Sequence, residues 1–269
     1  MRHPRFVFRL VLMAGLAATI GGGDAAAQVI AVPAADPAGA PTQTFYWQGA
    51  NARAVLLLIP GGEGHLNLNP AQTDVRPEFY QTLKQLSLGS VAEGIFDVVL
   101  FSSPTPLLYN ARAYPSSRAS NDHLTRIDKV IKFYKEKTLR PIWLMGHSNG
   151  AVSVTEYLRY VAKRGEPVQI AGLIVSSARD VTYFDATPLN LPILFLHHRK
   201  DGCRESPPAT SFANFQKVEA LNAAPTSFIY IETGSGEARS PCESGYHMYH
   251  EAGPDVAAAL RSFMMRSGR

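Results

Sequence analysis

The chain has 269 residues, of which 46% are hydrophobic and 18% charged, so it carries enough apolar material to fold around a core and is not intrinsically disordered. With 21 glycines, 19 prolines and 2 cysteines, it is neither a collagenous chain nor a dense disulfide scaffold. The formal net charge of +4 comes from scattered residues without a basic stripe, which argues against a nucleic-acid-binding protein.

The first 27 residues are predicted to be a secretory signal peptide. Three arginines precede an apolar run from Leu10 to Ile20, and the segment ends in three alanines before Gln28. The run is shorter than the roughly 20 residues of a membrane-spanning helix, so we expect cleavage near Ala27 rather than retention as an anchor. Cleavage leaves 26 minus 3 basic and 22 minus 1 acidic residues, a net charge of +2. We therefore predict an exported protein, periplasmic or secreted, with no stable membrane anchor after signal cleavage.

Residues 28–42 are rich in alanine and proline and are predicted to be a flexible leader, followed by one domain over residues 43–269. Short apolar runs recur along that domain, at residues 54–59, 96–101, 142–145, 170–175, 193–196 and 228–231. Runs that are apolar on both faces indicate strands covered from both sides, as in a parallel sheet. Segments of helical periodicity lie between or after them, at residues 124–134, 151–161, 212–221 and 253–264. This alternation predicts an α/β fold with a doubly wound, mostly parallel sheet.

Gly146-His147-Ser148-Asn149-Gly150 is a G-x-S-x-G motif between a predicted strand and a predicted helix. That context is the one a nucleophile elbow requires, a sharp turn that exposes a strained serine. The flanking positions must be glycine because side chains there would clash in the turn. We therefore predict Ser148 as a nucleophile, the alternative being an ordinary turn with an idle serine.

A serine hydroxyl is a weak nucleophile and needs a base that a third group orients. In the chain order serine, acid, histidine, the acid follows a late strand and the histidine follows the last one. Asp201 follows the run at residues 193–196, and His247 follows the run at residues 228–231. We predict Asp201 as the acid and His247 as the general base.

Three further residues are alternatives for these roles. Asp180 and Asp185 follow the preceding predicted strand and compete for the role of the acid, and His250 competes with His247 as the base. Four other histidines are predicted to be structural or surface residues, and the last two of them to brace the site from a strand end: His65, His123, His197 and His198.

An oxyanion hole is predicted from the N–H of Asn149 and one N–H of the loop after residues 54–59. This loop reads Pro60-Gly61-Gly62-Glu63, and its glycines let the main chain approach a substrate carbonyl. Gly62 or Glu63 is the predicted donor, unless the loop is a glycine-rich turn with no ligand role. The sequence shows neither a phosphate-binding glycine pattern nor a metal-ligand spacing, so no cofactor and no metal are expected.

Cys203 and Cys242 are the two cysteines of the chain. In an oxidising compartment they most simply form one disulfide, the alternative being two free thiols. Such a bond would tie the loop that carries the predicted acid to the loop that carries the predicted histidine.

With these motifs in place, the chain resembles the α/β-hydrolase superfamily, and more narrowly a group of exported, largely uncharacterised bacterial α/β hydrolases. The resemblance covers residues 52–267 and is carried by PGGEGHLNLN, GHSNG, LFLHHRKDGCRESPPA and PCESGYHMYH. It implies a Ser148, Asp201, His247 triad and a Cys203–Cys242 bond. The group has His-Gly-Phe where this chain has His247-Met248-Tyr249. A lid in such hydrolases enters where residues 176–192 lie here, and this short, proline-containing segment predicts no cap domain.

These features predict an exported serine hydrolase that cleaves carboxylic esters of small molecules through an acyl-enzyme intermediate. The same triad serves thioesterases, amidases and peptidases, which stay open as alternatives. A non-catalytic binding protein with a hydrolase-like fold is the alternative from another functional class. Oligomeric state and natural substrate are not readable from the sequence.

Overall fold

The computed structural model describes residues 28–68, 94–107, 117–184, 189–236 and 240–267, together with Tyr80 and Leu83. The predicted signal peptide, residues 1–27, lies outside this described part. None of the helices within it is long and apolar enough to cross a membrane.

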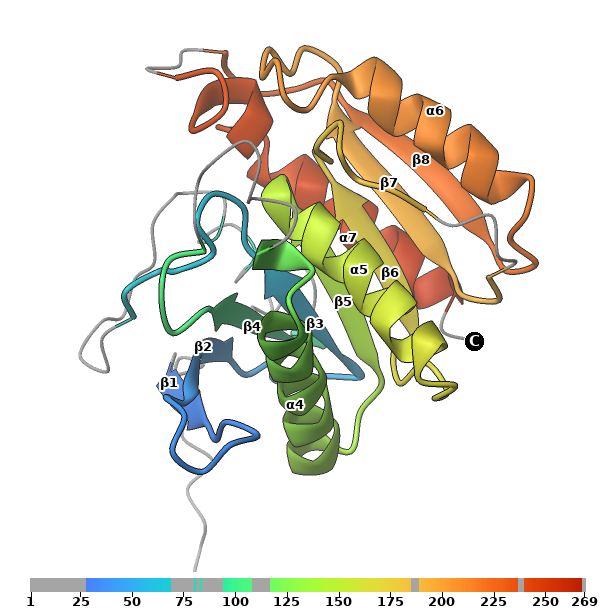
Figure 1. Ribbon diagram of the computed structural model, residues 1–269. Coiled ribbons are helices and arrows are strands. Elements are labelled where there is room, and N and C mark those ends of the chain that lie inside the picture. The colour runs from blue at the N-terminus through green and yellow to red at the C-terminus, as the bar shows by residue number, and fades with distance from the viewer. Residues whose placement is uncertain are drawn as a thin grey trace, which may run out of the picture.

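Eight strands of the described chain form one sheet, in the order β1-β2-β4-β3-β5-β6-β7-β8 (Figure 1). The strands are β1 Gln28–Val32, β2 Thr42–Trp47, β3 Ala54–Ile59, β4 Phe96–Ser102, β5 Ile142–His147, β6 Gly172–Ser176, β7 Ile193–His198 and β8 Thr226–Ile231. From β4 to β8 every neighbouring pair is parallel, whereas β1 and β2 run antiparallel to their neighbours. The predicted mostly parallel sheet is confirmed.

The first strands correct one prediction. The segment expected to be a flexible leader begins with β1, which pairs antiparallel with β2 so that Val29 stands opposite Phe45. The alanine and proline content of residues 28–42 concealed the β-branched stretch from Val29 to Val32. Pairing with β2 satisfies the main-chain groups on one side of this edge strand, which a flexible segment would leave to water.

Helices cover both faces of the sheet (Figure 1). On one face lie α4 Asn121–Thr138, α5 Asn149–Lys163 and α6 Pro208–Glu219, and on the other lies α7 Gly253–Ser267. The side chains of β3 alternate accordingly: Val55 and Leu57 pack in the core under α4 and α5, and Leu56 packs in the core under α7. Because the inner strands, such as β3 and β5, are buried on both faces, they read as continuous apolar runs in the sequence.

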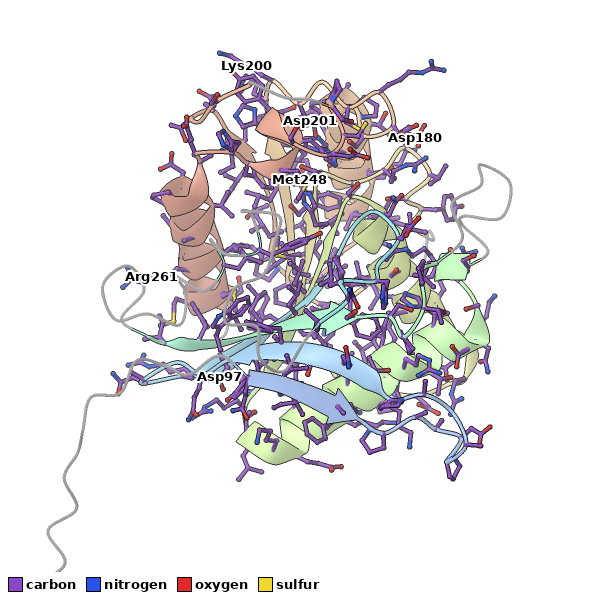
Figure 2. All side chains as sticks on the ribbon, turned by 90° about the vertical axis from the view of Figure 1, so that its left-hand side faces the viewer. Asp97, Asp180, Lys200, Asp201, Met248 and Arg261 are labelled. Atoms are coloured by element: carbon purple, nitrogen blue, oxygen red, sulfur yellow. A yellow bond between two sulfur atoms is a disulfide. The ribbon has the colours of Figure 1, made fainter. Side chains whose placement is uncertain are left out.

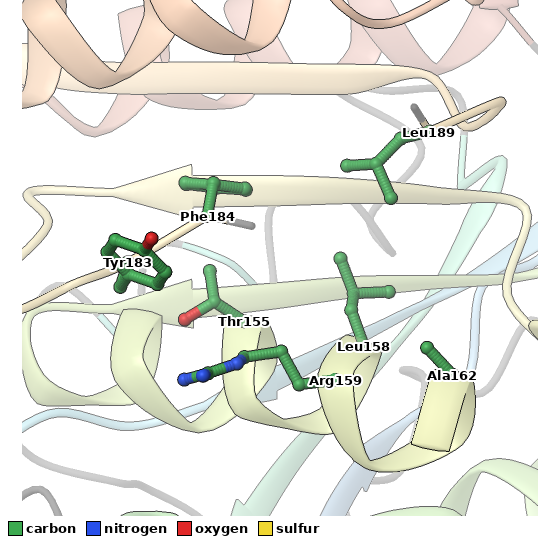
Figure 3. A pocket seen from close by; sticks show the side chains of 7 residues that line it. All are labelled: Thr155, Leu158, Arg159, Ala162, Tyr183, Phe184 and Leu189. Atoms are coloured by element: carbon green, nitrogen blue, oxygen red, sulfur yellow. The ribbon is translucent and has the colours of Figure 1, made fainter. Parts of the chain in front are cut away.

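The connection between β6 and β7 is a loop in its described residues, 177–184 and 189–192, as predicted for a chain without a helical cap. This loop packs on α5 and encloses a small cavity of about 60 Å³ (Figure 3). The cavity is lined by Thr155, Leu158, Arg159 and Ala162 of α5 and by Tyr183, Phe184 and Leu189 of the loop.

The interface between α4 and α5 contains a buried histidine. His123 Nε2 on α4 lies 2.9 Å from the Oγ of Ser153 on α5. Burial, followed by the positive charges of Arg118 and Arg126, lowers the pKa of His123 to about 3. The folded protein therefore keeps this imidazole neutral at pH values at which the unfolded chain protonates it.

We predict that His123 makes the protein less stable in mild acid. Its pKa is lower in the folded state, so its contribution is complete above about pH 6.5 and is lost as the pH falls toward 3, by about 1.4 kcal/mol per pH unit. Urea unfolding of the wild type and of His123→Gln between about pH 7.5 and 4.5 measures this slope. The wild type should lose free energy of unfolding relative to the variant as the pH falls, and a constant difference would contradict the prediction.

Candidate active site

Ser148 occupies a sharp turn between β5 and α5, at the carboxyl end of the parallel strands. Its backbone has φ 55° and ψ −119°, outside the regions that ordinary residues adopt. Its N–H donates to the carbonyl of Ser176 on the neighbouring strand at 2.9 Å, which holds the strained turn in place. Strain of this kind persists where the surrounding structure over-determines it, and it gathers at functional sites.

The two glycines of the motif are required by close main-chain contacts. A Cβ added to Gly146 would lie 2.3 Å from the carbonyl oxygen of Gly150. A Cβ added to Gly150 would lie 2.0 Å from the carbonyl oxygen of Ile59, at the end of β3. Both glycines of the G-x-S-x-G motif are therefore needed because the main chain of the turn packs too closely on itself and on β3 to leave room for a side chain.

The sequence-predicted acid and base are in direct contact. Asp201 lies after β7, and His247 lies in the short 3-10 helix Gly245–Met248, with His247 Nδ1 2.7 Å from Asp201 Oδ2. A carboxylate only accepts hydrogen bonds, so Nδ1 carries the proton and the neutral imidazole has its lone pair on Nε2. This Nε2 is buried and has no hydrogen-bond partner among the described residues.

Asp201 is held by more than one donor. His197 Nε2 lies 3.0 Å from the same Oδ2, and the N–H of Cys203 donates to Oδ1 at 2.8 Å. Burial by itself raises the pKa of Asp201, but hydrogen bonds from His197 and His247 outweigh it and hold the pKa well below its ordinary value. The carboxylate is therefore ionised throughout the neutral range. His197, predicted to brace the site from a strand end, binds the Asp201 carboxylate directly.

A cavity of about 200 Å³ lies between Ser148, His247 and the glycine-rich loop after β3. The loop residues that line it run from Gly61 to Leu66, and the others are Tyr80, His147, Ser148, Cys242, Glu243, His247 and Met248. Ser148 and His247 thus face one common space. Figure 2 shows Asp201 and Met248 toward one end of the molecule and Asp97, near the start of β4, toward the other.

The predicted oxyanion donors lie beside this cavity. Gly62 and Glu63 line it, and Gly62 has φ 53°, which glycine adopts at little cost. Asn149 is the first residue of α5, so its N–H has no acceptor within the helix. The Asn149 side chain accepts a hydrogen bond from Arg179 at 2.9 Å, which fixes it at the helix start.

Of the alternative residues, Asp180 and His250 belong to the described part of the chain, and neither lines the cavity. The imidazoles among the described residues that line the cavity belong to His65, His147 and His247, and His250 is not among them. The carboxylate of Asp180 lies 3.7 Å from Arg179 and is 48% exposed. Asp185 lies outside the described residues.

No family model and no curated protein matches the sequence, but solved structures match the fold. An α/β serine hydrolase without a lid from Xanthomonas campestris aligns with a TM-score of 0.54 at 11% identity, over 89% of this chain and 94% of that chain. An esterase from Pyrococcus furiosus aligns with a TM-score of 0.58 at 10% identity, over 89% and 92%. A soluble variant of monoglyceride lipase from Saccharomyces cerevisiae gives 0.54 at 12% identity, over 95% and 99%. The chain has the α/β-hydrolase fold.

Within this α/β-hydrolase fold, Tyr249 anchors the histidine loop to the sheet. Its hydroxyl donates to the carbonyl of Leu196 on β7 at 3.0 Å and accepts from Ser177 Oγ at 3.1 Å. The side chain is 2% exposed, and burial raises its pKa, so it stays a neutral donor. Tyr249 stands where the similar hydrolases have phenylalanine in their His-Gly-Phe segment. Its hydroxyl makes hydrogen bonds to the sheet that a phenylalanine could not make.

His147, next to Ser148 in the sequence, is a buried neighbour of the predicted base. Its ring centroid lies 5.2 Å from that of His247, and its Nε2 lies 3.3 Å from the sulfur of Met248. Burial, followed by the repulsion of a protonated His247, lowers the pKa of His147 well below its ordinary value. His147 therefore remains neutral at neutral pH.

The disulfide Cys203–Cys242 is present, with the two Cα atoms 4.6 Å apart. It joins the acid loop of the α/β-hydrolase fold to the segment before the 3-10 helix of His247. Among the described residues, a group that could hold a metal ion is Cys203, Glu205 and Cys242. Both of its sulfur atoms are consumed by the disulfide, so this group is not a metal site.

We predict that removing the disulfide destabilises the protein by up to about 4 kcal/mol, the chain-entropy value for a loop of this length. The bond closes a loop with a sequence separation of 39 residues and thereby restricts the unfolded chain. Urea unfolding of the wild type and the Cys203→Ala/Cys242→Ala double variant measures the difference. As a control, dithiothreitol should lower the transition midpoint of the wild type and leave the variant unchanged. Equal midpoints of the two proteins would show that the bond does not contribute to stability.

Proposed function

We propose that this chain is a serine hydrolase that cleaves carboxylic esters through an acyl-enzyme intermediate. One observation carries the proposal. The imidazole of His247 is bound to the buried Asp201 carboxylate at 2.7 Å, and its Nε2 has no hydrogen-bond partner among the described residues. His247 also lines the cavity that contains the strained Ser148. Neutral imidazole in this tautomer is a base, and a serine in such a turn is the group it would activate.

The chemistry follows from these positions. Ser148 Oγ attacks the ester carbonyl carbon while its proton passes to His247 Nε2, and Asp201 stabilises the imidazolium that forms. The main-chain N–H groups of Asn149 and of Gly62 or Glu63 stabilise the oxyanion of the tetrahedral intermediate. Collapse of this intermediate breaks the bond to the alcohol, which leaves with the proton from His247. Water then attacks the acyl-enzyme by the same sequence and releases the acid.

The test is covalent labelling of the folded, disulfide-bonded protein with a fluorophosphonate. We expect an intact-mass increase of one adduct and a modified peptide in which Ser148 carries the phosphonyl group. Heat-denatured protein is the control, because labelling depends on the assembled triad. Absence of an adduct on the folded protein, together with no turnover of any ester, would overturn the proposal in favour of a binding protein.

A substrate panel then tests the class of bond. We expect p-nitrophenyl esters of short acids to be turned over faster than matched thioesters and aminoacyl anilides. A higher kcat/KM for the thioester or for the anilide would replace the proposed esterase with a thioesterase or an amidase that uses the same triad.

We also propose that the mature protein works outside the cytoplasm, in the periplasm or the medium. Disulfides persist in oxidising compartments, and the sequence before Gln28 has the pattern of a signal peptide. Mass spectrometry of the protein recovered from fractionated cells should find it in the exported fraction with Gln28 as its first residue. Recovery of the full-length chain from the cytoplasm would contradict this.

A further inference from the structure

Arg118 is a buried arginine that contacts the loop after β3. Its Nη1 donates to the carbonyl of Pro60 at 3.0 Å, and its Nη2 donates to the carbonyls of Gly61 at 3.3 Å and Gly62 at 2.8 Å. The residue is 0% exposed. Three consecutive main-chain carbonyls of the glycine-rich loop therefore turn toward one buried positive charge.

These bonds set the direction of two amide groups. In a trans peptide unit, the C=O and the N–H point in opposite directions. The carbonyl of Gly61 shares its peptide plane with the N–H of Gly62, and the carbonyl of Gly62 shares its plane with the N–H of Glu63. Since both carbonyls face Arg118, both N–H groups face the other side of the loop. Gly62 and Glu63 line the cavity that contains Ser148 and His247.

The loop packs directly on the nucleophile. A Cβ added to Gly61 would lie 2.9 Å from the Cβ of Ser148. Small changes in the loop therefore change the distance between its N–H groups and the carbonyl that Ser148 attacks. Displacements of about 1 Å at such positions cost roughly 10²-fold in rate.

Arg118 is also tied to the helix that carries the other predicted oxyanion donor. Its Nη1 donates to Ser153 Oγ at 3.0 Å, and Ser153 lies one turn into α5, which begins at Asn149. His123 Nε2 binds the same Oγ at 2.9 Å and is neutral for the reasons given above. The arginine thus connects the donors of the loop to the donor at the helix start.

We propose that Arg118 is a positioning residue for the oxyanion hole, which aims the N–H groups of Gly62 and Glu63 at the substrate's carbonyl oxygen and polarises them. The guanidinium withdraws electron density through the carbonyl side of the same peptide groups, so their N–H groups become stronger donors. The inference rests on the proposed function, because an oxyanion forms only if Ser148 attacks a carbonyl.

The test compares Arg118→Lys with Arg126→Lys. Lysine keeps the charge but lacks the planar fork that reaches several carbonyls at once. Arg126 is the matched control, because it donates to the carbonyl of Ala40 at 2.7 Å and does not line the cavity. Rates are expressed per active site, counted by complete labelling with the fluorophosphonate, so that the folded fraction does not enter.

For Arg118→Lys we expect kcat to fall by about 10- to 100-fold with little change in KM, since the lost interaction belongs to the transition state. The affinity for a trifluoromethyl ketone, whose adduct with the serine carries an oxyanion, should fall by a similar factor. Arg126→Lys should match the wild type in both. A purely structural role of Arg118 would lower the melting temperature and leave kcat per labelled site and ketone affinity unchanged, which would overturn the inference.

If Arg118→Lys does not fold, Ser153→Ala decides the question. It removes one anchor of the guanidinium, so kcat and ketone affinity should fall together by a smaller factor, and wild-type values of both would overturn the inference. Two failures are distinguishable. Unchanged values in an active, labelled protein refute the role of Arg118 alone. A wild type that neither labels nor turns over esters refutes the proposed function and this inference with it.

Discussion

Replacing Ser148 with alanine is expected to abolish fluorophosphonate labelling and to lower kcat for ester hydrolysis by about 10⁶-fold, as loss of a serine nucleophile does elsewhere. The hydroxyl is the atom that forms the acyl-enzyme, and no neighbouring group can replace it in the same turn. Alanine keeps the φ of 55°, so the strain of the elbow stays and the melting temperature should change little. Intact-mass labelling and initial rates measure both effects.

The matched control is Ser211→Ala. Ser211 is a buried serine of α6 whose hydroxyl has no hydrogen-bond partner among the described residues, and it does not line the cavity. Its removal should leave labelling and kcat at wild-type values, because it deletes a buried hydroxyl that makes no bond. An Ser148→Ala protein that labels as strongly as this control would show that another residue is the nucleophile.

The sheet could be predicted from the sequence where strands are buried on both faces. The apolar run at residues 54–59 is β3 itself, and the runs at residues 142–145 and 193–196 fall inside β5 and β7. The edge of the sheet could not be predicted in this way. β1 and β2 lie at an antiparallel edge, and β1 has exposed and half-buried residues, so it lacks the continuous apolar run that identifies an inner strand.

Three residues of the candidate site could be predicted from their order along the chain and their positions after predicted strands. Ser148, Asp201 and His247 each follow a predicted strand, and carboxyl ends of parallel strands meet at one edge of a sheet. Arg118 was not predicted as a part of the site, and His197 was predicted to brace the site but not to bind Asp201. The contacts of Arg118 depend on how its segment packs on the loop after β3 and on α5, and the contact of His197 depends on the turn that brings Asp201 back to the end of β7. Hydrophobic periodicity encodes neither. Arg118 in particular gives no signal beyond its residue type, because its partners are main-chain carbonyls distant in sequence.

His247→Gln is expected to lower kcat by about 10⁶-fold, while His250→Gln should change it by less than about tenfold. A glutamine side chain can still donate a hydrogen bond to Asp201, but it cannot take the proton from the serine. His250 is the control, since it lies three residues away and does not line the cavity. Initial rates per milligram of folded protein decide between the two histidines, and a large loss in His250→Gln with an active His247→Gln would reverse the assignment of the base.

The same variant tests the pairing through acid stability. The lowered pKa of Asp201 stabilises the wild type at pH values above the ordinary carboxyl pKa, and this stability is lost as the pH falls below it. His247→Gln replaces the imidazole, whose charge also lowers the pKa of Asp201, with a neutral amide. The pKa of Asp201 should therefore move back toward its ordinary value, and the acid dependence should become shallower. His197→Gln should have a similar effect on acid stability, because His197 binds the same Oδ2, but a far smaller effect on kcat. A large loss of kcat in both variants would mean that His197 also takes part in proton transfer. If both variants change acid stability but only His247→Gln loses kcat, His247 is the base and both histidines support the carboxylate.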